Sequence, residues 1–222
     1  SLFPDGNAGL TYAAVKWADA FFRAGLHLAI ATTSTLWPAE FRSDRQGLFP
    51  DIDFDGVDAD HAKSQLRAHA GFVEQQLADG RAFLAGPAPG LLDIHAWTVP
   101  WFTRASVPGA NELYAAFTRM AAWENRVDDL GEGQRKDCTA EEAFAVARAS
   151  KPAPSMVDPD DAQGLQAGLT VEVMPDDTRR GAVRGILVGA GVNELAVQRE
   201  HPKCGAVVVH FPRLGYRVTR VD

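Results

Sequence analysis

The chain has 222 residues, a hydrophobic content of 46% and a formal net charge of −7 at pH 7. This length accommodates one large or two small domains with a hydrophobic core. The acidic charge argues against nucleic acid or an anionic membrane as the main partner, and no apolar run reaches the roughly 20 residues that span a bilayer.

No secretory signal peptide opens the sequence, but the chain begins at Ser1 rather than at an initiator methionine, so this observation carries little weight. The two cysteines, Cys138 and Cys204, lie far apart and outside any C-x-x-C spacing. A reduced, cytoplasmic setting is the simplest interpretation of this cysteine usage.

The first predicted element is one long helix from Asn7 to about Leu36, with apolar residues on more than one face. A helix with several apolar faces is buried on several sides. Trp37-Pro38 ends or kinks this helix, because proline cannot donate the next helical hydrogen bond. Residues 44–56 are rich in Asp, Gly and Pro and are expected to form a loop.

The second predicted helix starts with Asp58 as its N-cap and runs to Ala78, where Gly80 closes it. Its apolar stripe is spaced four, three and four residues apart, which is typical of a helix packed on one side. This stripe consists of Leu66, Ala70, Val73 and Leu77.

Three further helices are predicted before residue 150. The first runs over residues 91–106 and the second over 111–129. The third is a short helix to Ala149, opened by a capping box with Thr139 as N-cap and Glu142 at N3.

The composition changes after residue 150. Residues 151–168 are rich in proline and are predicted to form a linker. Five short β-rich runs separated by turn residues follow. These runs cover residues 169–174, 184–189, 194–199, 206–211 and 216–221. The predicted fold class is therefore α+β: a helical domain (1–150), a linker (151–168) and a small all-β domain (169–222), arranged as a meander or barrel.

The most specific pattern lies in residues 76–96. The chain crosses a Gly/Pro-rich loop after Phe83-Leu84-Ala85-Gly86 and enters an apolar helix with Gly90 at the N-cap and Asp93 at N3. The Asp93 carboxylate can accept a hydrogen bond from the backbone N–H of residue 90, and it suits the positive end of the helix dipole. In order and spacing, this segment resembles the central helix of the all-helical C-terminal domain of glutathione transferases.

Two features bear on this resemblance. The family usually carries Ser or Thr where this chain has Gly90, and glycine is worse at an N-cap by only a few tenths of a kcal/mol. Pro100 removes one hydrogen bond within the helix and therefore needs surrounding helices to hold it. The resemblance covers about residues 7–149, and the all-β region looks like an extension found in some bacterial members.

The resemblance implies that the chain supplies the electrophile-pocket side of a site that conjugates or reduces substrates with glutathione as co-substrate. It also implies a homodimer of the full-length protein, and a thioredoxin-like domain ahead of Ser1 that carries the thiol-activating residue. No catalytic residue is therefore named, and the chain alone is expected to be inactive as an enzyme. The substrate-binding candidates on the first helix are Tyr12, Lys16, Trp17 and Phe21. For Trp17 and Phe21, ordinary packing in the hydrophobic core is the competing interpretation.

A non-catalytic function is the alternative, because transferase-like helical domains also serve as protein-interaction and assembly modules. The end of the all-β region is basic and aromatic, and an acidic partner patch would suit it. A charged edge strand that avoids pairing explains the same pattern.

No metal site is expected. Asp51, Asp53 and Asp55 with Gly56 imitate the start of a calcium loop, but the closing position is Ala62 instead of a bidentate Glu. The histidines lack the spacing of a zinc site. His95, near the start of the apolar helix, is expected to be a core histidine with one hydrogen-bond partner.

Overall fold

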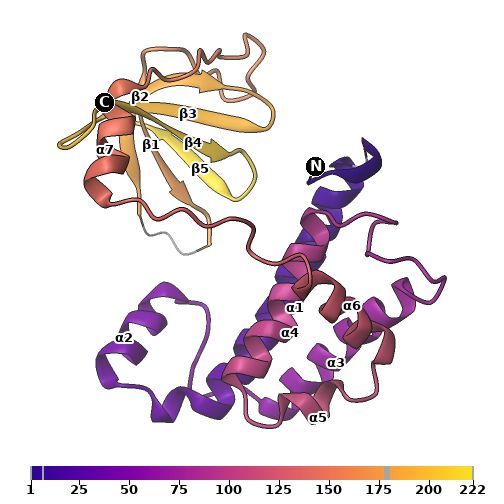
Figure 1. Cartoon of the computed structure of the whole chain (residues 1–222). Helices are drawn as coiled ribbons and strands as arrows, with labels where there is room; N and C mark the ends of the chain where they lie inside the picture. The colour runs from indigo at the N-terminus through magenta and orange to yellow at the C-terminus, as the bar shows by residue number, and fades with distance from the viewer. Residues whose placement is uncertain (1, 7, 178–180, 222) are drawn as a thin grey trace. The chain divides into compact units, whose positions relative to one another are not determined.

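The computed structural model describes residues 2–6, 8–177 and 181–221. The chain divides into two compact units: a helical unit (residues 1–47 and 51–134) and a β unit (residues 135–222 with 48–50). The helices of the first unit run from indigo to magenta in Figure 1, and the sheet of the second is orange to yellow. Among the described helices, none combines the length and the apolar character needed to cross a membrane.

The helical unit packs α1, α3, α4 and α6 around one core. The fully buried side chains come from all four of these helices and include Phe21, Leu66, Val99 and Trp123. The elements are α1 (Ala8–Thr33), α2 (Ala39–Leu48), α3 (Ala59–Gln76), α4 (Leu91–Ser106), α5 (Ala110–Tyr114) and α6 (Thr118–Asp128), with short 3-10 turns at Pro4–Gly6 and Ser34–Leu36.

The close approach of α1 to α4 depends on Gly25. A Cβ atom at this position would lie 2.9 Å from Cγ2 of Thr103 on α4 and 3.4 Å from Cγ1 of Val99. Both α4 side chains are fully buried, so there is little room for them to move. A small residue is therefore required where the two helices meet.

Two predicted elements differ from the structure. The loop predicted over residues 44–56 is wrong for its first part, because Ala39–Leu48 forms α2. This helix has no buried residue and hence no apolar periodicity to detect. The helix predicted over 111–129 is divided into α5 and α6, and the carboxylate of Glu74 on α3 accepts a hydrogen bond from the N–H of Met120 in the first turn of α6 (2.9 Å).

The β unit contains α7 (Ala140–Ala149) and a five-stranded antiparallel sheet in the order β4-β3-β2-β1-β5. Each β-rich run predicted from the sequence overlaps one strand, so the chain is α+β. The strands are β1 (Thr170–Pro175), β2 (Val183–Ala190), β3 (Glu194–His201), β4 (Gly205–Pro212) and β5 (Tyr216–Arg220). The core on one face of the sheet includes Val171, Val173, Leu187, Leu195 and Val197, each with no exposed surface.

The connection from β4 to β5 forces the sheet to curl. These two strands form opposite edges of the sheet, yet only residues 213–215 join them. In a flat sheet, five strands place the edges about 19 Å apart, whereas a link of this length reaches at most about 14 Å. The sheet therefore bends toward an open barrel, which encloses the apolar side chains on its concave face.

The structure divides the chain earlier than residue 150, the boundary expected from composition. The helix Ala140–Ala149 belongs to the β unit. Within the region expected to be a linker, Val157 forms a bridge with Ala190 of β2, and Leu165 is 5% exposed in the sheet's core. Residues 151–168 are therefore packed against the sheet and do not form a free spacer.

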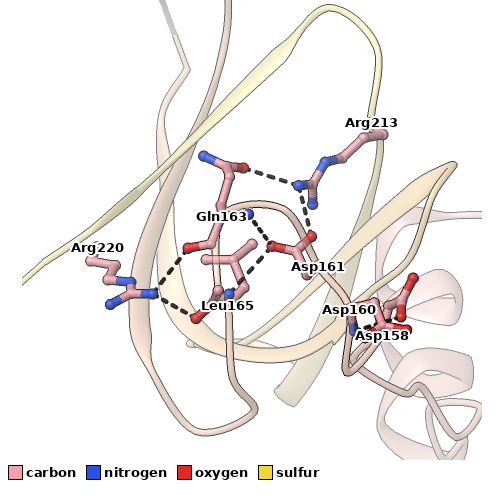
Figure 2. Close-up of polar contacts among 8 residues, drawn as sticks. Asp158, Asp160, Asp161, Gln163, Leu165, Arg213 and Arg220 are labelled. Atoms are coloured by element: carbon pink, nitrogen blue, oxygen red, sulfur yellow. Dashed lines mark hydrogen bonds and ion pairs between the residues drawn. The ribbon is translucent and has the colours of Figure 1, made fainter.

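Polar contacts hold the loop 158–165 against the sheet (Figure 2). Nη2 of Arg213 donates to the Asp161 carboxylate at 2.8 Å and to the side-chain oxygen of Gln163 at 3.0 Å. Nη2 of Arg220 donates to two backbone carbonyls of the same loop, at 3.1 and 2.6 Å. The side chain of Asp161 is 6% exposed, so this ion pair is largely shielded from water.

Stability of the β unit is expected to depend on Asp161 and on pH. Burial by itself raises the pKa of this carboxyl, but the N–H groups of Leu165 and Gln163 and the Arg213 guanidinium together hold it below its ordinary value. The stabilisation is then fully present above the unfolded-state pKa of about 3.9. It is lost as the pH falls through the lower folded-state pKa.

Asp161→Asn should therefore lower the unfolding temperature of the β unit at pH 6, and the difference from wild type should shrink below pH 4. Calorimetric scans between pH 3 and pH 7 measure this, with the exposed neighbour Asp160→Asn as the matched control. Tryptophan fluorescence should report no change, because all five tryptophans lie in the helical unit. Equal effects of the two substitutions would contradict the assigned ion pair.

Candidate functional site

The start of α4 is organised by a buried carboxylate. Asp93 is completely buried, and its two oxygens accept three hydrogen bonds. The donors are the backbone N–H groups of Leu84 (2.8 Å) and Gly90 (3.0 Å) and the indole N–H of Trp123 on α6 (2.8 Å). A buried charge is tolerated only with such partners. Asp93 therefore joins the loop before α4, the first turn of α4, and α6.

The structure explains why glycine is the N-cap of α4. The backbone carbonyl of Leu2 accepts the N–H of Leu91 at 2.8 Å, which satisfies one of the unpaired donors at the helix start. A Cβ atom on Gly90 would lie 2.9 Å from Cδ of Pro4 and 3.2 Å from this Leu2 carbonyl oxygen. The N-terminal segment thus occupies the space that a Ser or Thr side chain at position 90 would need.

A cavity of about 420 Å³ lies beside this helix start, within the usual size range of small-molecule sites. Its lining comes from three places in the sequence and is mainly apolar. α1 contributes Leu10, Thr11, Ala14 and Trp17, and α3 contributes Phe72, Val73 and Gln76. Arg81, Leu84, Ala85 and Leu92 complete it from the turn after α3 and the start of α4.

The turn that forms one wall of the cavity is held by paired polar groups. Nε2 of Gln76 and Nη1 of Arg81 both donate to the backbone carbonyl of Leu84, at 2.8 and 3.2 Å. The same guanidinium binds the Asp79 carboxylate, with the shortest contact at 2.6 Å. Arg81 thereby lowers the pKa of Asp79 to about 2. Arg81 is the charged residue in the described lining, and its charge is already balanced, so the cavity suits an uncharged ligand.

Of the four substrate-binding candidates, Trp17 lines the cavity. Phe21 lies one helical turn further along α1, has no exposed surface and stacks on Trp17 with 5.8 Å between ring centroids. It belongs to the core beneath the cavity wall, next to the ring of His69 (5.4 Å). Burial lowers the pKa of His69, which favours its neutral form.

Tyr12 and Lys16 are not part of the described lining. Tyr12 is 51% exposed and packs on Phe3, with 5.2 Å between ring centroids. The ammonium group of Lys16 lies 3.1 Å from the carboxylate of Asp19 at the helix surface. The structure therefore brings neither side chain into the apolar cavity.

Of the described cavity lining, Trp17 alone is a substrate-binding candidate from the sequence. Phe72 lies next to Val73 of the buried stripe on α3 but is 53% exposed. An exposed aromatic beside a complete core stripe was the available signal, because the stripe by itself already satisfies the packing of the helix. The contribution of the turn residues Arg81, Leu84 and Ala85 depends on tertiary contacts.

The expectation that His95 is a core histidine is wrong, since its side chain lies on the exposed face of α4.

The acidic residues after α2 form contacts with nearby residues. The Asp55 carboxylate pairs with Arg42 at 2.7 Å, and the Asp53 carboxylate accepts the N–H of Asp55. Across residues 2–6, 8–177 and 181–221, no group of three or more His, Cys, Asp or Glu side chains is arranged to hold a metal ion.

Comparison with known proteins supports the fold. No protein-family model and no curated protein sequence matches this chain. Among solved structures, a GST-like protein from Pseudomonas syringae matches it with a TM-score of 0.73 and 28% sequence identity. The match covers 100% of this chain and 71% of that protein, so it includes both units. The chain therefore has a GST-like fold, in agreement with the resemblance seen in residues 76–96.

Replacing Asp93 by Ala is expected to destabilise the helical unit by about 3–5 kcal/mol, because three buried N–H groups lose their acceptor. Urea unfolding followed by tryptophan fluorescence reports this unit alone. Asp60→Ala, in the first turn of α3 with a 91% exposed side chain, is the control and should change stability by less than about 0.5 kcal/mol. A loss below about 1 kcal/mol for Asp93→Ala would contradict the proposed role of the carboxylate.

Proposed function

We propose that the helical unit binds a small apolar or aromatic electrophile in the cavity between α1, α3 and the turn before α4. In this proposal the chain acts in a GST-like protein that conjugates or reduces this electrophile with glutathione. The observation that carries the proposal is an apolar cavity of about 420 Å³, walled by Trp17, in a chain with a GST-like fold.

The chemistry of the lining suits the electrophile and not glutathione. Glutathione carries two carboxylates and an ammonium group, and such charges need partners when they leave water. The lining offers Arg81, whose guanidinium is already bound by Asp79, and the neutral polar groups of Thr11 and Gln76. We therefore assign the cavity to the apolar co-substrate alone, and activation of the glutathione thiol is not assigned to these residues.

The contribution of the cavity is to remove the electrophile from water and to hold it in one place. The flat indole of Trp17 offers a stacking surface, while Leu10, Phe72 and Leu84 provide aliphatic and aromatic walls. Trp17 is itself supported from behind by the fully buried ring of Phe21. Binding is therefore expected to follow the apolar area of the ligand.

A neutral aromatic probe, N-phenyl-1-naphthylamine, is expected to bind the chain saturably at one site. Ala14→Phe should weaken this binding about tenfold or more, because the new ring fills the space beside Trp17. Ala13→Phe is the matched control, because residue 13 is exposed on the same helix and does not line the cavity. Probe fluorescence measures both affinities, and thermal unfolding checks that the variants are folded.

Two results would contradict the proposal: no saturable binding of the probe to the wild-type chain, or equal effects of Ala14→Phe and Ala13→Phe on its affinity. Either result would favour the alternative, a protein-interaction module without a small-molecule site. That alternative predicts a partner captured without any dependence on the cavity.

A further inference from the structure

A second hollow of about 370 Å³ lies on the helical unit, between the end of α3 and one face of α6. Arg81, Arg119 and Arg126 line it. The rest of the lining consists of Leu77 and small residues, including Ala78, Ala82 and Ala122. Small side chains among long cationic ones leave an open space that guanidinium groups surround.

The three guanidinium groups are not equally satisfied. Arg81 is fully engaged by Asp79 and the Leu84 carbonyl. Arg119 donates from Nη1 to the Glu74 carboxylate at 3.1 Å, and its side chain is 55% exposed. Arg126 donates from Nε to the backbone carbonyl of Ala82 at 2.9 Å.

Arg126 has no acidic partner within the part of the chain that the structure describes. The hollow therefore has three cations against the two carboxylates of Asp79 and Glu74, an excess of one positive charge, in a chain whose formal net charge is −7. An excess cation in an acidic protein is a local feature of this hollow, and it attracts anions at short range.

Arg119 and Arg126 lie on the same face of α6. Residues 119, 122 and 126 are spaced three and four apart and so lie on one face of the helix. The bonds to Glu74 and Ala82 fix one edge of each outer guanidinium, and the remaining N–H groups of Arg119 and Arg126 have no acceptor within the described part of the chain. A guanidinium held in this way is prepared for a carboxylate or a phosphate group.

The end of α3 is partly capped. The carbonyl groups of Val73, Gln75 and Leu77 accept the N–H groups of Leu77, Ala78 and Gly80. These bonds reduce the partial negative charge that the end of a helix presents.

We infer that this hollow binds a small organic anion, with its carboxylate or phosphate group between Arg119 and Arg126 and its apolar part on Leu77 and Ala122. This site is separate from the apolar cavity, although Arg81 lines both. The inference does not rest on the proposed function of that cavity.

The test uses three probes on the whole chain at low ionic strength: inorganic phosphate, phenyl phosphate and benzoate. Calorimetric titration is expected to give saturable binding of phenyl phosphate or benzoate, and weaker binding of inorganic phosphate because it lacks the apolar part. The tighter of the two aromatic anions identifies the preferred charged group. No saturable binding of any probe would overturn the inference.

Two pairs of variants separate the site from general charge effects. Arg126→Gln should weaken binding of the preferred aromatic anion about tenfold. Arg23→Gln removes an equal charge from an exposed position on α1 outside the hollow and should leave binding unchanged. Ala122→Glu should abolish binding by placing a carboxylate in the hollow, whereas Ala121→Glu, also exposed on α6 but outside the lining, should not.

Equal effects within either pair would show a non-specific response to net charge and would overturn the inference. Thermal unfolding of each variant identifies any loss of structure. Binding of N-phenyl-1-naphthylamine should stay at the wild-type value in Ala122→Glu, so failure of the anion site and failure of the apolar cavity give different results.

Discussion

The helical unit depends on one buried charge. The Asp93 carboxylate has no contact with water in the folded protein. Its burial is therefore tolerated only because three N–H groups donate to it. Those donors lie in the loop before α4, at the α4 N-cap, and on α6, so the carboxylate fixes segments that are far apart in the sequence. Leu84 and Leu92, which wall the apolar cavity, belong to the segments that Asp93 holds.

The turn after α3 gives the helical unit two different surfaces. Arg81 borders both the apolar cavity and the arginine-lined hollow, and Asp79 balances its charge. On the cavity side this pairing leaves an uncharged wall. On the other side Arg126 keeps an excess positive charge, because its only described contact in the hollow is a neutral carbonyl. One salt-bridged turn therefore separates an apolar cavity from a hollow lined by arginines.

The β unit is shaped by the shortness of the link between its edge strands. Three residues connect β4 to β5, and this limit bends the sheet around its core. The link also begins with Arg213, which binds Asp161 of the preceding loop (Figure 2). The region whose composition resembles a linker thus becomes part of the folded unit through a long-range ion pair.

The sequence by itself determined the elements whose signals are local. The buried stripe of α3, the limits of α4, the capping box at Thr139 and the five strands all follow from periodicity and end residues within a few positions of one another. Tertiary structure alone decided that Trp17 faces a cavity while Phe21 enters the core, and that arginines from α6 and the turn after α3 meet. These outcomes depend on which faces of distant segments come into contact. The residues that flank a position in the sequence do not determine those contacts.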